Sequence, residues 1–135
     1  MVSAVAILTA KPDGPDNVAA RFDRAEAMAH GFGEGIMTPI LFVAFPQSYG
    51  VWNSKSRFAL EALGLWPDRN RGDSKGQHYE HVNGVLYHAR KTLNENLPAG
   101  VHPVDLCTID YFWQAIKVKL DRKELDDLIH RFRTR

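Results

Sequence analysis

The stretch "GFGEGIMTPILFVAFPQSYGVWNSKS", from Gly31 to Ser56, places two close glycines in front of an apolar run. The run over 36–45 carries no charged residue, and Pro39 lies inside it. Because proline is tolerated in a helix mainly in or close to the first turn, a helix here must begin near Gly35. The stretch therefore predicts a buried helix that starts directly after the glycines.

Helical spacing continues on both sides of this stretch. Before the glycines, apolar residues recur every three or four positions, and Gly31 is suited to end that helix in the left-handed conformation. Beyond the apolar run, a side-chain oxygen of Asn53 or Ser54 is suited to cap another helix, while residues 2–9 fit either a short helix or a strand. Helices are expected over 17–29, 35–45, 53–65 and 78–96, and after Asp105 and Asp121. Since strand patterns are scarce, we predict an all-α fold, a compact bundle of about six helices.

The composition is that of an ordinary folded chain, with 135 residues, 44% hydrophobic and 24% charged. We therefore expect a single helical domain over residues 1–135. The net charge of +1 argues against strong non-specific binding of polyanions, although local basic patches remain compatible with it. Cys107 is the single cysteine, which favours a reducing, cytoplasmic setting. The apolar run is too short to span a bilayer, so no membrane contact is expected.

Gly31-Phe32-Gly33 stands between two expected helices, as the hairpin of a helix–hairpin–helix does. Two glycines let the backbone turn tightly and approach another molecule closely. Their N–H groups, with those of the next helix start around Gly35, are expected to face outward and bind an anion, typically a nucleic-acid phosphate. A simple helix–helix turn is the alternative interpretation. A dinucleotide fingerprint would need a preceding strand, and none is visible in the sequence.

The order of helix, G-h-G, apolar helix and then Val51-Trp52-Asn53-Ser54 resembles the core of helix–hairpin–helix DNA glycosylases of the endonuclease-III type. In that family a hydrophobic-aspartate-threonine motif starts a helix at a similar separation beyond the hairpin. Asn53 stands where that aspartate would stand. The resemblance runs from 17 to about 119, with a helix–hairpin–helix core over about 17–65. It implies a DNA-binding fold.

Departures from this family concern catalysis. The amide of Asn53 carries no charge and does not act as a general base at neutral pH. The lysine nucleophile of the bifunctional members would stand at Gly35, so no amine is present there for a Schiff base. One cysteine does not supply the four ligands of the iron–sulfur cluster that some members carry. We therefore predict no catalytic residue and no intact glycosylase chemistry.

The chain also resembles, more closely but in less specific terms, a module of bacterial proteins, some of restriction-like or mobile-element character. The resemblance rests on "YGVWNSKSRFALEALGLWP" (49–67), "GQHYEHVNGVLYHAR" (76–90) and "DLCTIDYFWQAI" (105–116). This resemblance implies that asparagine is the usual residue of the motif, so that Asn53 has a structural or recognition role. It also implies a place in a restriction, repair or mobile-element system.

We predict a nucleic-acid-binding module, with DNA as the expected partner through phosphate contacts. Trp52 is the aromatic residue expected at the binding edge, where Lys55 and Arg57 add positive charge. Two alternatives stand beside this prediction: a protein–protein scaffold that contacts other domains or subunits, and a DNA N-glycosylase with an atypical active site. The predicted nucleic-acid-binding residues are Gly31, Phe32, Gly33, Gly35, Trp52, Asn53, Ser54, Lys55 and Arg57.

Several histidines fall on one expected helix. His78 and His81 are three residues apart, and His81 and His88 are seven apart. A two-histidine helical metal site usually has i,i+4 spacing and a third ligand from elsewhere, so we predict no metal site and no cofactor. Cys107, ahead of an apolar helix, is expected to be a buried small hydrophobe.

Overall fold

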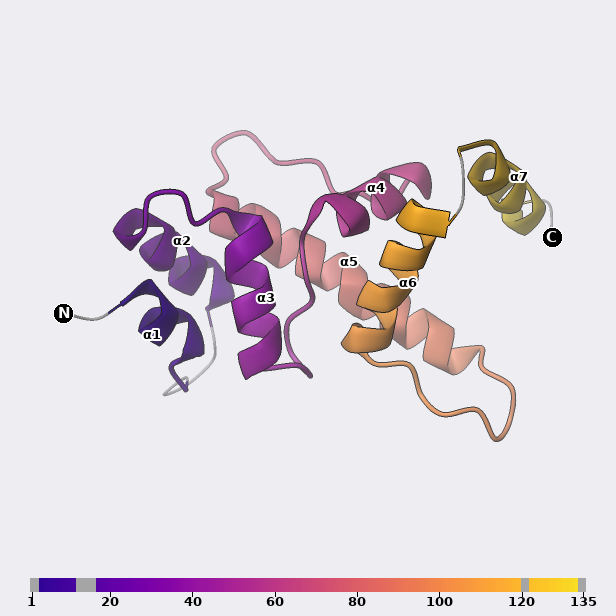
Figure 1. The fold of residues 1–135 in the computed structure, drawn as a ribbon, viewed down its shortest axis with the longest axis horizontal. Helices are drawn as coiled ribbons and strands as arrows, with labels where there is room; N and C mark the ends of the chain where they lie inside the picture. Colours follow the sequence, from indigo (N-terminus) through magenta and orange to yellow (C-terminus); the bar gives the residue numbers. More distant parts are fainter. Residues whose placement is uncertain (1–2, 12–16, 120–121, 134–135) are drawn as a thin grey trace.

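The computed structural model describes residues 3–11, 17–119 and 122–133. Within these ranges the chain forms seven helices and no strand, which confirms the predicted all-α fold class, and residues 4–9 are a helix (Figure 1). The helices are α1 (Ala4–Thr9), α2 (Val18–Met28), α3 (Glu34–Ala44), α4 (Ser54–Ala62), α5 (Lys75–Glu95), α6 (Leu106–Lys119) and α7 (Arg122–Arg133). No helix in the described ranges is both long and apolar enough to cross a membrane.

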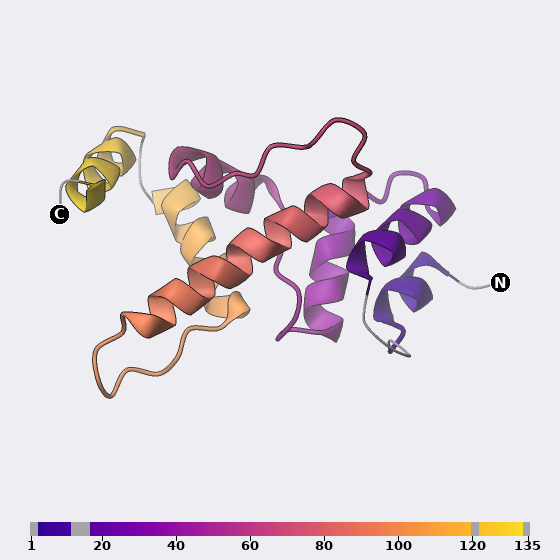
Figure 2. The ribbon, with the colours of Figure 1, turned by 180° about the vertical axis from the view of Figure 1, so that it is seen from behind.

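The long helix α5 runs behind the other helices and connects the two ends of the molecule (Figure 1). Helix α2 packs against it near one end, and α1 packs against both α2 and α3. Helix α6 packs against α5 near the other end and also against α4. Seen from behind, α5 crosses in front of both groups (Figure 2). Helix α7 lies at the end of the molecule opposite the N-terminus.

One hydrophobic core joins these helices. Phe22, Leu60 and Tyr79 are fully buried, and the rings of Phe22 and Tyr79 have centroids 5.5 Å apart. Tyr79 donates a hydrogen bond of 2.7 Å to the carbonyl of Gly50, and burial raises the pKa of its phenol. The buried hydroxyl therefore ties α5 to the segment that precedes α4.

Gly76 allows α5 to approach α2 closely. Its N–H donates a hydrogen bond of 2.8 Å to the carboxylate of Asp23. A Cβ on Gly76 would overlap the backbone carbonyl of Ala19 and the carboxylate of Asp23. At Gly84, further along α5, the same position is open space. A side chain would therefore clash with α2 at Gly76 but would meet no other atom at Gly84.

Side-chain caps start several helices. Asn53 caps α4, and the carboxylate of Asp105 accepts a hydrogen bond of 2.8 Å from the N–H of Thr108 at the start of α6, as the sequence predicted. Ser74 caps α5, which begins at Lys75, three residues before the predicted start at 78. The earlier start follows from a capping box, in which the side chains of Ser74 and Gln77 each accept a hydrogen bond from the other residue's backbone N–H.

Cys107 lies in the first turn of α6 and is exposed, so the expectation of a buried cysteine is wrong. The core face of α6 consists of residues that recur every three or four positions, namely Leu106, Ile109, Trp113 and Ile116. Each residue of a helix is turned by about 100° from the one before it, so Cys107, next to Leu106, does not lie on that face.

Candidate functional site

The predicted hairpin is a tight turn between α2 and α3. Gly31 has a φ of 90°, in the left-handed region that glycine adopts without a steric penalty. The N–H of Phe32 donates to the carbonyl of Ala29 and the N–H of Gly33 donates to the carbonyl of Gly31, each at 3.1 Å. The Gly33 N–H is therefore used inside the turn, and the expectation that it faces outward is wrong.

Helix α3 begins at Glu34, one residue before the predicted start. Its N-cap is Gly33, which has no side chain to accept hydrogen bonds from the first-turn N–H groups. Nothing lies within 4 Å of the place where a Cβ on Gly33 or Gly35 would stand. The first turn of α3 is therefore open to the close approach of another molecule.

A lysine and two carboxylates border this helix start. Lys75 Nζ lies 3.1 Å from Glu26 Oε1 and 3.4 Å from Glu34 Oε2. The hydrogen bond to Glu26, together with the charge of Glu34, raises the pKa of Lys75, although burial opposes the shift. The electrostatics are therefore mixed, because the positive helix start and Lys75 face two acidic side chains.

Asn53 forms a capping box at the start of α4. Its Oδ1 accepts hydrogen bonds from the N–H groups of Lys55 at 2.9 Å and of Ser56 at 3.0 Å. The Ser56 hydroxyl in turn accepts a hydrogen bond of 2.9 Å from the Asn53 N–H. The predicted capping role of Asn53 is confirmed, and its side-chain oxygen is directed at the helix backbone.

A buried threonine joins the two helix starts. The N–H of Trp52 donates a hydrogen bond of 2.9 Å to the hydroxyl of Thr38, which is fully buried. The hydroxyl lies 2.7 Å from the carbonyl of Glu34 and 3.1 Å from that of Trp52. Helices α3, α4 and α5 all begin along the same edge, at the top of Figure 1. The glycine turn over 31–33 and the Asn53 cap therefore lie along one edge of the molecule.

Trp52 is a core residue, contrary to the expectation that it faces a ligand. Its side chain is only 5% exposed. Its ring centroid lies 5.4 Å from that of Trp66 and 4.9 Å from that of His78, both in edge-to-face arrangements. His78 Nε2 lies 2.8 Å from the carbonyl of Pro67. These contacts hold the loop after α4 against α5 and leave the Trp52 ring no open face.

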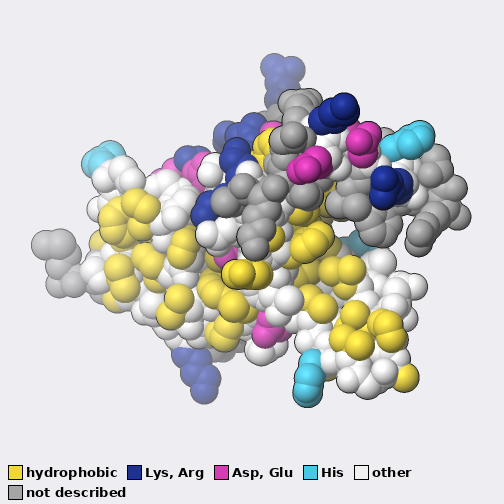
Figure 3. Space-filling view, turned by 45° about the vertical axis from the view of Figure 1, so that its right-hand side comes forward, with side chains coloured by type: hydrophobic (Ala, Val, Ile, Leu, Met, Phe, Trp, Pro, Cys, Tyr) yellow, Lys and Arg dark blue, Asp and Glu magenta, His cyan; other side chains and the backbone are white. Residues whose placement is uncertain are grey.

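The predicted polar residues of α4 lie on its surface. Ser54 is exposed at the first position of α4, and Lys55 is partly buried behind it. Arg57 pairs with Glu61 at 2.8 Å, and its guanidinium lies 5.3 Å from the ring centroid of Trp66. Both partners of that ion pair are about half exposed, so water screens it strongly. Positive side chains also appear along the upper edge in the space-filling view (Figure 3).

Asp110 is a partly buried acidic residue near Lys55 that the sequence analysis did not single out. It lies on α6, half buried, and burial raises the pKa of its carboxyl, while the charge of nearby Lys55 lowers it in part. Its helical position beside the apolar residues Ile109 and Trp113 was the available signal. The charge of Lys55 on α4 therefore offsets only part of the effect of burial on the Asp110 carboxyl.

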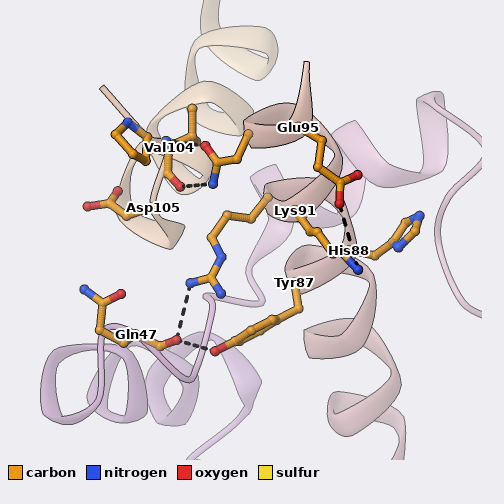
Figure 4. A pocket seen from close by; sticks show the side chains of 10 residues that line it. Gln47, Tyr87, His88, Lys91, Glu95, Val104 and Asp105 are labelled. Carbon is orange, nitrogen blue, oxygen red and sulfur yellow. Dashed lines mark hydrogen bonds and ion pairs between the residues drawn. The ribbon is translucent and has the colours of Figure 1, made fainter. Parts of the chain in front are cut away.

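A hollow of about 800 Å³ lies between α5 and the segment that leads into α6 (Figure 4). Asn94 shapes it by pairing with the backbone of Val104, through bonds of 2.9 and 2.6 Å. Tyr87 donates a hydrogen bond of 2.6 Å to the carbonyl of Gln47, and the Arg90 guanidinium lies over the Tyr87 ring. Its lining includes Lys91 and Arg90 but also Glu95 and Asp105, so no single charge dominates.

The histidines of α5 do not meet in one place. His78 is buried, and its Nε2 forms a hydrogen bond with the backbone carbonyl of Pro67. His81 Nδ1 lies elsewhere, 3.8 Å from a carboxylate oxygen of Asp73. Among the described residues, no three His, Cys, Asp or Glu side chains are grouped as metal ligands.

Comparisons of the chain with protein families, with curated proteins and with solved structures found no match.

Proposed function

We propose that this chain binds nucleic acid, with DNA as the first candidate, through phosphate contacts at the edge where α3 and α4 begin. The observation that carries the proposal is the Thr38 bridge, which holds the first turn of α3 beside the Asn53 cap of α4. Helix starts attract anions through their N–H groups and their dipoles. The start of α3 has no side-chain cap and offers its N–H groups to a phosphate. At the start of α4 the Asn53 cap already uses the N–H groups of Lys55 and Ser56, so α4 contributes its dipole and the charge of Lys55.

The predicted residues take different roles in this proposal. Gly31 and Phe32 shape the turn, and Gly33 and Gly35 leave room for a phosphate to reach the backbone. On α4, the exposed residues Ser54 and Arg57 and the partly buried Lys55 contribute directly. Trp52 and Asn53 act indirectly, because the first is buried and the second caps the helix.

We propose that the chain shares the DNA-binding core of the helix–hairpin–helix glycosylases and lacks their catalytic chemistry. Gly35 offers no nucleophile, and the Asn53 oxygen is engaged by backbone N–H groups. Binding without base excision is therefore the activity that we infer, within a restriction, repair or mobile-element system. Because Glu26 and Glu34 lie at the same edge, the affinity is expected to be modest.

Binding of a fluorescently labelled duplex at low salt tests this proposal. Gly33→Val places a side chain in the open space before α3, and we expect it to weaken binding by roughly fivefold. The matched control is Gly84→Val, which adds the same side chain at an open position of α5. Lys55→Gln is expected to lower the salt slope of the affinity by about one unit. Equal affinities in all variants, or no binding by the unaltered chain, would show the proposal to be wrong.

A scaffold that docks on another protein is the second candidate, and an apolar face favours it. Val5, Ile36 and Val43 are about half exposed or more, on α1 and α3. A hollow of about 620 Å³ lies beside them, lined by Thr9, Pro39, Ile40, Val43 and Ala44. Apolar side chains cover this end of the molecule in Figure 3. Binding of a hydrophobic dye tests whether this apolar face is accessible. Val43→Lys should reduce the fluorescence of the bound dye, and an unchanged fluorescence would count against this candidate.

A further inference from the structure

We propose that the ligand at this edge is single-stranded nucleic acid, which continues from the α3–α4 edge across the surface of α4 and α6 and stacks a base on Tyr111. This inference rests on the proposed function and specifies its ligand. It is carried by cation–aromatic pairs and an exposed ring that lie outside the helix starts.

Two cations lie over aromatic rings on this surface. The Arg57 guanidinium is 5.3 Å from the ring centroid of Trp66, and Lys117 Nζ is 4.5 Å from that of Phe58. Attraction between a cation and the face of a ring restrains the side chain without neutralising it. Lys117 belongs to α6 and Phe58 to α4, so the second pair spans the contact between these helices. The result is a positive charge at Lys117 that is held between two helices, while Glu61 offsets the charge of Arg57.

Lys55 connects this surface with the proposed phosphate edge. It follows the Asn53 cap by two residues, and its charge acts on Asp110 of α6. A nucleic-acid strand that places a phosphate at the start of α4 therefore meets Lys55 next and α6 beyond it. Two acidic groups oppose the path, Asp110 itself and Glu61, which pairs with Arg57.

Tyr111 supplies the stacking surface. It is 70% exposed, more than any other aromatic residue that the structure describes. Asp110 and Lys117 share one side of α6, because seven residues make nearly two turns, and Tyr111 is rotated from that side by about 100° toward solvent. Its ring is therefore exposed on the neighbouring side of α6, about a third of a turn away from Asp110 and Lys117, where a strand that passes Lys117 would reach it. Exposed aromatic rings next to cations are what sequence-tolerant single-strand binders use.

A single strand fits this surface better than a duplex or an acidic peptide. In a duplex the faces of the bases are stacked on one another and do not reach Tyr111. An acidic peptide supplies the negative charge but no flat ring to stack. Stacking therefore distinguishes the three ligands, whereas charge alone does not.

The test measures binding of a labelled oligothymidylate of about a dozen nucleotides and of a duplex of matched length. Tyr111→Ala is expected to weaken oligothymidylate binding on the order of tenfold and to leave duplex binding unchanged. Tyr111→Phe keeps the ring and is expected to bind like the unaltered chain. An oligoglutamate peptide serves as a competitor that carries charge only.

The outcomes separate this inference from the proposed function. Oligothymidylate binding that is unaffected by Tyr111→Ala overturns the inference, and the proposed function stands if Gly33→Val still weakens binding. Efficient competition by oligoglutamate also overturns the inference, because charge then accounts for the affinity. Absence of binding to both nucleic acids at low salt overturns both. If Tyr111→Ala weakens binding of the oligothymidylate but not of the duplex, and Tyr111→Phe binds both normally, the result supports the stacking of a base on this ring.

Discussion

The N–H of Trp52 donates a hydrogen bond of 2.9 Å to the hydroxyl of Thr38, which lies one helix earlier in the chain. Replacing the hydroxyl by a methyl group in Thr38→Val keeps the shape but leaves this buried N–H without an acceptor. We expect a loss of about 1–3 kcal/mol in the free energy of unfolding. Urea denaturation provides the measurement, with Thr92→Val on the exposed surface of α5 as the control. A loss no larger than that of the control would contradict the structural role of the bridge.

Removal of the Asn53 cap is expected to destabilise α4. Asn53→Ala leaves the N–H groups of Lys55 and Ser56 without their acceptor, and we expect a cost of about 1 kcal/mol. Asn53→Asp keeps an oxygen at the cap and should retain the stability, because a negative charge is favourable at a helix start. Thermal denaturation of both variants checks this prediction. A melting temperature of Asn53→Ala equal to that of the unaltered chain would show that the cap contributes nothing.

The two glycines of α5 are expected to respond oppositely to alanine. Gly76→Ala drives a methyl group against the backbone of Ala19, and overpacking of this kind costs about 1–3 kcal/mol. Gly84→Ala meets open space and removes backbone freedom from the unfolded chain, so it should stabilise by roughly 0.5–1 kcal/mol. Denaturant midpoints of the two variants give the comparison directly. A stabilising Gly76→Ala would mean that α2 and α5 are not in close contact.

Asp110 is expected to make stability depend on pH. Because burial raises its pKa, the folded chain holds this proton more tightly than the unfolded chain does. The contribution to stability is therefore fullest below the unfolded-state pKa of about 4 and is lost as the pH rises through the folded-state pKa. Asp110→Asn should raise the melting temperature at neutral pH, with a gain that shrinks in acid. Glu80→Gln, at an exposed position of α5, is the control. A gain that is equal at both pH values would refute this account.

Local signals account for the part of the site that the sequence predicts. The start of α3 and the Asn53 cap depend on residues within one turn of each other, so glycine, proline and asparagine positions suffice to locate them. The burial of Trp52 depends on Trp66 and His78, which come from later segments. A tryptophan beside a polar motif fits a ligand surface and a core equally well until those partners are known.

Contacts between distant segments account for the rest. The Thr38 bridge and the position of Lys75 between Glu26 and Glu34 each need two segments whose relative placement no local pattern supplies. The exposure of Cys107 was within reach of the sequence, because the apolar spacing of α6 already sets its core face. The prediction that Cys107 is buried relied on the apolar residues beside it and did not take that spacing into account.

Because Cys107 is exposed, a thiol-reactive probe can be attached to the chain at this residue. It is the single thiol in the sequence, and it precedes Tyr111 by one helical turn, where side chains four apart have Cβ atoms about 5–6 Å from each other. A maleimide dye or a nitroxide spin label therefore reacts at one defined place without any engineered cysteine. Its emission or its spectral line width would report directly whether a bound strand restricts the surface of α6.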